Sequence, residues 1–185
     1  INHKTTKLSE RELFIINDSN QEDFKNFFQS AFNDSVDSFF ALSTCNRTEV
    51  YIFGSSTSAT QIAQKTLEFF GSSDSLNNDL YFFNDNEAIE HMCNVASGLD
   101  SQVLGEQEIL GQFKKSIQTY TALGSLKGEF QRLTDDIISI AKAARTETQI
   151  GFNSLSVSGL SLKIVQEIFE DPAQQKLTIV GAGQM

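Results

Sequence analysis

The 185-residue chain is 39% hydrophobic and 21% charged, an ordinary globular composition with room for one large domain or one and part of a second. Its formal net charge of −10 argues against broad electrostatic binding of nucleic acid, which needs a basic surface. Two cysteines cannot form a disulfide framework, and no apolar run reaches the roughly 18 residues of a membrane span. With no signal-peptide pattern, we expect a cytoplasmic protein.

The first third of the chain predicts a strand end, two helices and a hairpin. Residues 1–5 are typical of the end of a strand, and a capping-box pattern at Ser9 predicts a short helix. A stripe of phenylalanines at helical spacing follows within 24–31. The apolar runs 39–42 and 50–53 then predict two strands joined by a polar tip.

The tip of this hairpin carries Cys45, two residues before Arg47. Loops held by a rigid scaffold carry much of protein chemistry, and a neighbouring positive charge lowers the pKa of a thiol. We therefore expect Arg47 to favour the thiolate of Cys45, which is strongly nucleophilic. The alternative is a small buried cysteine without chemistry, and the residues alone leave both open.

A helix at 62–70 and a strand at 80–83 complete the first half. This order predicts an α+β fold, with an antiparallel four-stranded sheet and helices packed on one face in a ferredoxin-like βαββαβ arrangement. A helix from Asn86 follows, with Cys93 in its apolar stripe. His91 points away from that stripe, so periodicity alone predicts an isolated surface histidine.

Glycines at 98 and 105 bracket the polar residues Asp100, Ser101 and Gln102. This pattern predicts a loop with sharp bends or close backbone approach, and the polar residues suit a polar amino-acid ligand. The alternative is a plain corner between helices, capped by Asp100 or Ser101.

Long helices are predicted at 109–120, 130–146 and 157–168. A strand at 176–180 then leads into Gly181-Ala182-Gly183, the opening of a dinucleotide-binding turn and a weak signal by itself. We therefore expect two domains, 1–150 and 151–185, the second containing the first strand of a truncated Rossmann domain.

Five segments together resemble glutamyl-tRNA reductase: INHKT at 1–5, STCNRTEVY at 43–51, GLDSQVLGEQEILGQ at 98–112, RTETQIG at 145–151 with SVS at 156–158, and the final IVGAGQM. The resemblance implies NADPH-dependent reduction of glutamyl-tRNA(Glu) to glutamate-1-semialdehyde through a thioester on Cys45. That reaction is the first step of tetrapyrrole (porphyrin and haem) biosynthesis by the five-carbon route. The first domain would be the catalytic, glutamyl-recognising one, and the fragment alone is not expected to reduce.

Carried over position by position, the resemblance implies catalytic roles for Cys45 and His91. The implied substrate contacts are Thr44, Cys45, Asn46, Arg47, Ser101, Glu106, Gln107, Glu108 and Gln112. An incomplete NADPH site falls on Gly181, Ala182, Gly183, Gln184 and Met185, and no metal is expected. The family usually has Glu-Pro-Gln where this chain has Glu106-Gln107-Glu108, which puts the contacts at 107 and 108 in question.

The implied partners are glutamyl-tRNA(Glu) and the downstream aminomutase, with a homodimer expected only for the full-length protein and no membrane association. Two other classes stay open from the residues. One is a hydrolase that uses a cysteine and a histidine. The other is a non-catalytic binding or regulatory module in which Cys45 is inert.

Overall fold

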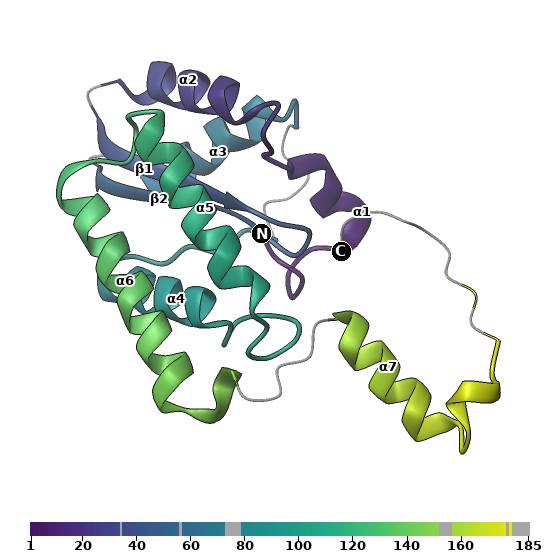
Figure 1. The fold of residues 1–185 in the computed structure, drawn as a ribbon. Helices are drawn as coiled ribbons and strands as arrows, with labels where there is room; N and C mark the ends of the chain where they lie inside the picture. Colours follow the sequence, from purple (N-terminus) through teal and green to yellow (C-terminus); the bar gives the residue numbers. More distant parts are fainter. Residues whose placement is uncertain (34, 56, 73–78, 152–156, 177, 179–185) are drawn as a thin grey trace.

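The computed structural model describes residues 1–33, 35–55, 57–72, 79–151, 157–176 and 178. Two strands and a series of helices make up these residues (Figure 1). In chain order they are α1 (Leu8–Arg11), the 3₁₀ helix η1 (Glu12–Phe14), α2 (Gln21–Phe32), β1 (Val36–Ser43), β2 (Thr48–Ser55), α3 (Ala59–Phe69), α4 (Asp85–Ser97), α5 (Glu108–Ala122), α6 (Gly128–Glu147), η2 (Gln149–Gly151), α7 (Val157–Ile168) and η3 (Pro172–Gln174). The α+β class is therefore confirmed.

The centre of the fold is the predicted hairpin of β1 and β2. The strands pair antiparallel, with Phe40 opposite Tyr51 and Ser43 opposite Thr48 at the turn. The other edge of β1 is covered by the connection between α5 and α6. There the Ser38 hydroxyl donates to the carbonyl of Ser125 at 3.0 Å and accepts from the N–H of Lys127 at 3.0 Å. The main chain is also paired there, because the N–H of Phe39 donates to the carbonyl of Ser125 at 3.0 Å, at an edge that would otherwise be open to another chain.

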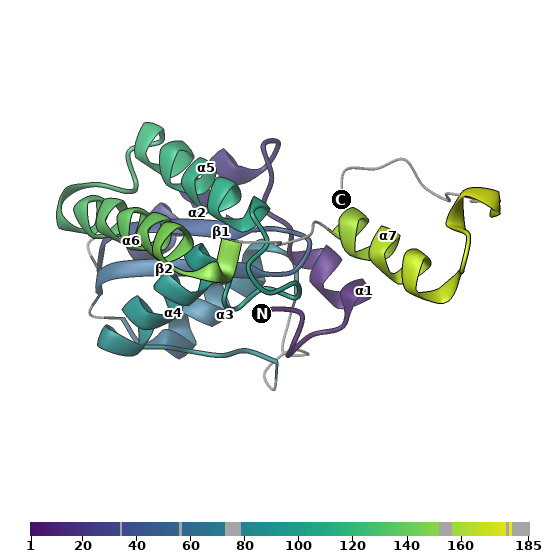
Figure 2. The same cartoon turned by 60° about the horizontal axis from the view of Figure 1, so that its bottom comes forward.

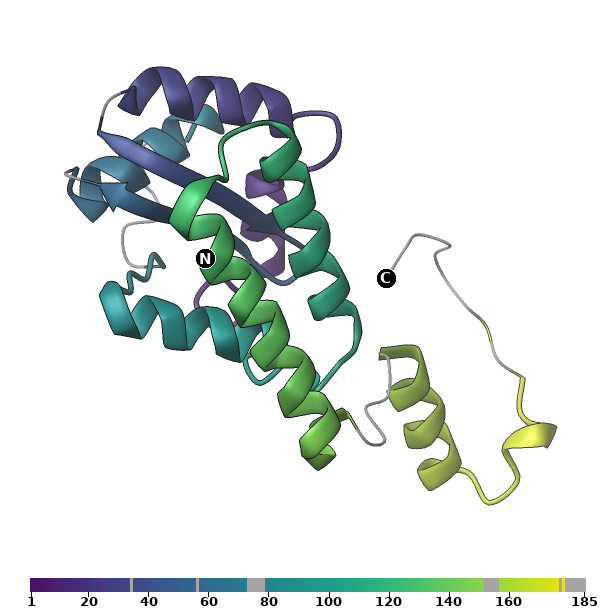
Figure 3. The same cartoon turned by 60° about the vertical axis from the view of Figure 1, so that its left-hand side comes forward.

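Helices cover both faces of the hairpin, and the prediction of helices on one face is wrong. The ring of Phe39 packs against Phe28 of α2, with centroids 4.5 Å apart. The next residue, Phe40, packs against Phe113 of α5 and Phe130 of α6 at 5.6 Å each. Successive strand residues point to opposite faces, so α2 and the α5–α6 pair lie on different sides, as Figure 3 shows.

The described residues contain a two-stranded sheet and not the four strands predicted. Near the N-terminus, Asn2 forms only an isolated bridge to Arg47. The chain then turns, because the side chain of Asn2 accepts from the N–H of Lys4 at 2.9 Å and its carbonyl accepts from Thr6 at 3.0 Å. The strand predicted at 176–180 falls mostly outside the described residues.

The apolar run 80–83 is not a strand either. It contacts the rest of the fold through its side chains and not through main-chain pairing with the sheet. The rings of Tyr81 and Phe83 pack against His91 of α4, with centroids 5.7 and 4.5 Å away. The segment therefore covers α4 as an irregular stretch rather than adding to the sheet.

The core is built largely from phenylalanine. Phe24, Phe28, Phe40 and Phe113 are completely buried, and they join α2, β1 and α5 in one cluster. Helices α4, α5 and α6 pack side by side against this cluster (Figure 2). Among the described helices, none has both the length and the apolar composition needed to cross a bilayer.

Candidate functional site

The turn between β1 and β2 is held by a dense set of hydrogen bonds. The N–H of Thr44 donates to the carbonyl of Arg47 at 2.8 Å, which makes Cys45 and Asn46 the central turn residues. The Thr44 hydroxyl accepts from the N–H groups of Asn46 and Arg47 at 3.1 and 3.2 Å. The N–H of His3 donates to the carbonyl of Asn46 at 2.8 Å. Cys45 is exposed on this fixed turn, so the alternative of a buried core cysteine is wrong.

The charges around Cys45 differ from those expected. Desolvation by its immediate neighbours is the largest effect and raises the pKa of the Cys45 thiol. The carboxylates of Glu106 and Glu108 raise it further, whereas Arg11 lowers it. The net result is a thiol pKa above its ordinary value. The expectation of a lowered thiol pKa is therefore wrong, and the cation among the leading contributions is Arg11 rather than Arg47.

Arg47 is instead sequestered inside the fold, with 2% of its surface exposed. Its Nη1 donates to Glu49 at 2.9 Å, and its Nη2 donates to the carboxylate of Asp100 at 3.1 Å and to the Asp100 main-chain carbonyl. Burial by itself would lower the pKa of Arg47, but Glu49 and other neighbouring groups raise it overall. Arg47 is thus a charged, buried link between β2 and the loop after α4.

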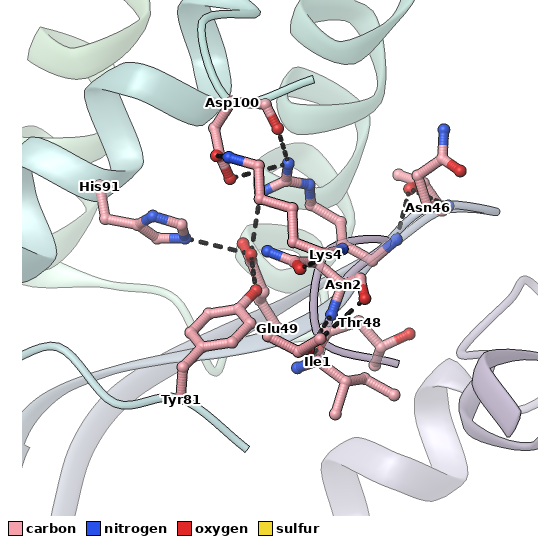
Figure 4. Close-up of polar contacts among 12 residues, drawn as sticks. Ile1, Asn2, Lys4, Asn46, Thr48, Glu49, Tyr81, His91 and Asp100 are labelled. Carbon is pink, nitrogen blue, oxygen red and sulfur yellow. Dashed lines mark hydrogen bonds and ion pairs between the residues drawn. The ribbon is translucent and has the colours of Figure 1, made fainter. Parts of the chain in front are cut away.

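Four donors surround the buried carboxylate of Glu49, and Figure 4 shows two of them, Tyr81 and His91, beside it. The four donors are the guanidinium of Arg47, the hydroxyls of Tyr51 and Tyr81, and Nε2 of His91 at 3.1 Å. Burial would raise the pKa of Glu49, but the hydrogen bond from His91 and the charge of Arg47 outweigh it and lower the pKa to about 2. Burial and Glu49 raise the pKa of both tyrosines, which keeps them protonated as donors.

His91 belongs to this network and is not an isolated surface histidine. Its ring stacks on Phe83 with centroids 4.5 Å apart and planes 27° apart. Within the described part of the chain, its hydrogen bond goes to Glu49 and not to Cys45. The structure therefore places His91 against Glu49, which its hydrogen bond orients.

The loop between α4 and α5 bends sharply, as its glycines predict. Gly98 and Gly105 have φ values of +80° and +76°, which glycine adopts readily. Arg145 of α6 holds the far end of the loop by donating to the carbonyls of Gly105 and Glu106. At the near end, Asp100 pairs with Arg47 and Lys4. The loop is fixed at both ends against the hairpin.

Buried side-chain atoms that have no hydrogen-bond partner among the described residues include Oγ of Ser101, Nδ1 of His3 and Nε of Arg145. Ser101 follows Asp100 directly, and the His3 main chain contacts Asn46. Orphaned polar atoms are rare in folded proteins and mark places where a water or ligand can bind. Ser101, an expected substrate contact, therefore has an available hydroxyl.

The remaining expected contacts lie at the start of α5. Glu106 is half-buried, Gln107 and Glu108 are exposed, and Gln112 follows Glu108 by one helical turn. Glu106 and Glu108 act on the Cys45 thiol through their charge, so the structure brings this segment near the turn that carries Cys45. The expected cofactor residues 181–185 lie outside the described residues. No cluster of metal-binding side chains occurs in the residues that the structure describes.

Sequence reasoning missed Arg11, Lys4 and Glu49. Glu49 had a usable signal. In an extended chain, residues two positions apart lie on the same face, so Glu49 and Arg47 are expected side by side. Arg11 had none. It lies 34 residues before Cys45, yet its Nε donates to the Cys45 carbonyl at 3.3 Å.

The fold and the site together define an α+β domain that presents an exposed cysteine on a fixed turn between acidic and basic side chains. Residues 1–148 match the family described as Glutamyl-tRNAGlu reductase, N-terminal domain. The chain therefore belongs to the glutamyl-tRNA reductase family and contains its N-terminal domain.

Individual relatives agree with this assignment. The chain is 39% identical over 146 residues, 78% of its length, to the glutamyl-tRNA reductase of Vesicomyosocius okutanii, covering 35% of that protein. It is 35% identical along all of its length to the glutamyl-tRNA reductase of Pseudoalteromonas atlantica, covering 43% of it. The solved structure of glutamyl-tRNA reductase from Methanopyrus kandleri matches 90% of the chain and 38% of its own, with 28% identity and a TM-score of 0.70. The chain thus spans less than half of each relative.

Proposed function

We propose that this chain carries the glutamyl-accepting half of a glutamyl-tRNA reductase. In this proposal Cys45 takes the glutamyl group from glutamyl-tRNA(Glu) and holds it as a thioester. The observation that carries the proposal is the exposure of Cys45 at the centre of a turn fixed by main-chain and Thr44 hydrogen bonds. A reactive thiol needs both access and a defined position, and this turn provides both.

The transfer step is an acyl exchange without redox change. Sγ of Cys45 bonds to the ester carbonyl carbon, the bond from that carbon to the tRNA 3′ oxygen breaks, and the thiol proton ends on the departing oxygen. The Ser101 hydroxyl, which has no hydrogen-bond partner among the described residues, is suited to the charge that develops on the carbonyl oxygen. Sulfur donates less electron density into a carbonyl than oxygen does, so a thioester accepts hydride more readily than an ester.

The glutamyl group carries a positive α-ammonium and a negative side-chain carboxylate. Glu106 and Glu108, both acting on the thiol by charge, suit the ammonium. We keep Thr44, Asn46, Gln107 and Gln112 as proposed contacts around the same turn. Arg47 remains a proposed carboxylate contact, although its Nη1 and Nη2 already face Glu49 and Asp100. For His91 we propose a shaping role through Glu49 rather than proton transfer.

In the complete protein, NADPH would supply the hydride that releases glutamate-1-semialdehyde, the first committed product of tetrapyrrole synthesis. We propose that residues 151–185 begin the domain that holds this cofactor. We also propose a cytoplasmic homodimer for the complete protein, which passes its product to the downstream aminomutase. No step proposed for this chain depends on those parts.

The experiment is transfer of labelled glutamate from glutamyl-tRNA(Glu) to the chain without NADPH. We expect label on the peptide that contains Cys45 and slow release of glutamate by hydrolysis. Cys45→Ser should abolish both, whereas the matched variant Cys93→Ser, on α4, should retain them. Undiminished transfer in Cys45→Ser would remove the assignment of the nucleophile.

The same experiment tests the two other classes. A cysteine–histidine hydrolase would turn over many equivalents of ester. It would need Cys45 paired with His91, and the hydrogen bond from His91 to Glu49 does not favour that pair. A non-catalytic module would take up no label. Selective alkylation of Cys45 over the half-buried Cys93 would also argue against an inert thiol.

A further inference from the structure

Arg11 joins two parts of the chain at the turn that carries Cys45. It is the last residue of α1 and half-buried. Its Nε donates to the main-chain carbonyl of Cys45 at 3.3 Å, and its Nη1 donates to the carbonyl of Thr6 at 2.6 Å. A planar guanidinium with donors in a fixed fork is suited to bridge two carbonyls in this way.

The nearer arginine in sequence is paired with carboxylates other than those near the thiol. Arg47 points into the fold, where its charge is matched by Glu49 and Asp100. Arg11 lowers the pKa of the Cys45 thiol through its charge, and it opposes the two carboxylates of Glu106 and Glu108. The thiol therefore lies between one positive group from α1 and two negative groups at the start of α5.

We infer that Arg11 is the positioning residue of the nucleophile: its guanidinium holds the Cys45 main chain and supplies the positive charge beside the thiolate. This inference rests on the proposed function only in taking Cys45 as the nucleophile. It gives α1, which is too short to be stable alone, a defined role in the site. It also gives the two arginines different partners, because Arg47 pairs with Glu49 and Asp100, whereas Arg11 holds the main chain of Cys45.

The test is the pH dependence of alkylation of Cys45 by iodoacetamide, followed by peptide mass analysis from neutral to alkaline pH. Cys93 in the same molecule is the internal standard. The variants are Arg11→Gln, which removes the charge, and Arg11→Lys, which keeps it. Arg132→Gln is the matched control, because Arg132 is exposed on α6 and its removal changes the net charge equally.

In Arg11→Gln we expect the midpoint of the Cys45 profile to rise, with alkylation slowed about 3- to 10-fold below the midpoint and equal to the parent above it. Arg11→Lys should shift the midpoint less, and Arg132→Gln should leave it unchanged. Glu106→Gln should move it the other way. A role in folding alone would not produce this pattern, because it would alter Cys93 as well.

An unchanged midpoint in Arg11→Gln, or an equal shift in Arg132→Gln, would overturn the inference. If Arg11→Gln does not fold, Arg11→Met serves in its place, because it keeps the aliphatic stem and removes the charge. The alkylation assay uses no tRNA, so its outcome is independent of the glutamyl-transfer experiment. If Arg11→Gln shifts the midpoint of Cys45 alkylation but the chain takes up no glutamyl group, the role of Arg11 stands and the proposed function is refuted.

Discussion

Replacement of Glu49 by glutamine tests whether the buried carboxylate holds the site together. Glutamine keeps the shape of the side chain but removes its charge. Arg47 would then keep only Asp100 as an ionic partner, and the hydroxyls of Tyr51 and Tyr81 would lose their ionised acceptor. The change thus isolates the electrostatic part of the network from its packing.

The magnitude follows from the pKa of Glu49. Its fall from 4.5 to about 2 corresponds to about 3 kcal/mol of stability at neutral pH. Removal of one partner of a buried ion pair costs about 3–5 kcal/mol, because the other charge stays buried. We therefore expect Glu49→Gln to lower the free energy of unfolding by about 3 kcal/mol.

The assay is urea unfolding followed by circular dichroism at several pH values. Glu90→Gln is the matched control, because Glu90 is exposed on α4 and should change stability by less than about 0.5 kcal/mol. Since the pKa of Glu49 is lowered in the folded state, its contribution is complete above pH 4.5 and is lost as the pH falls towards about 2. The difference between parent and variant should shrink over that interval. A loss under about 1 kcal/mol at neutral pH would refute this account of the network.

Three further predictions concern the scaffold around the site. Gly105→Ala should destabilise the protein in thermal unfolding, because φ is +76° and the added Cβ would clash with the carbonyl oxygen of Ile150. Gly111→Ala in α5 is the control, because a Cβ there meets nothing within 4 Å, and it should stabilise the protein by about 0.5–1 kcal/mol in the same assay. Ser38→Ala should cost about 1–3 kcal/mol in urea unfolding because it leaves the Lys127 N–H unpaired, whereas the exposed Ser139→Ala should be near neutral. Burial lowers the pKa of His3 below 6.5, so folding stability should fall as the pH drops below that value. His3→Gln should flatten this pH dependence of the free energy of unfolding, and an unchanged dependence would contradict the placement of His3.

The hairpin could be predicted because its information is local. Two apolar runs flank a polar tip, so the sequence predicted the two strands and placed Cys45 in the turn between them. Whether Cys45 is exposed or buried stayed open until the structure showed it exposed. The sharp bends at Gly98 and Gly105 could be predicted in the same way. The strand at 80–83 was wrong because an apolar, aromatic run does not show whether its backbone or its side chains make the contacts. Here Tyr81 bonds Glu49 and Phe83 packs on His91.

The electrostatics of the site could not be predicted from neighbours in sequence. Arg47 lies two residues from Cys45, but its direction is set by Glu49 and by Asp100, which lies 53 residues away. The charges that act on the thiol come from α1 and from the start of α5. Only the tertiary fold brings these segments together, so a local argument assigned the right kind of residue to the wrong partner.

The raised pKa of Cys45 leads to one last prediction about its activation. Most reactive cysteines lie in electropositive surroundings, whereas desolvation, together with the charges of Glu106 and Glu108, raises the pKa of this thiol and makes it less prone to oxidation. The α-ammonium of a bound glutamyl ester would offset these carboxylates and leave the charge of Arg11 to favour the thiolate. Glu106→Gln should then speed alkylation of the free thiol near neutral pH and yet slow glutamyl transfer, because the ammonium loses its partner. If both rates rise together, the carboxylate only restrains the thiol and takes no part in binding the substrate.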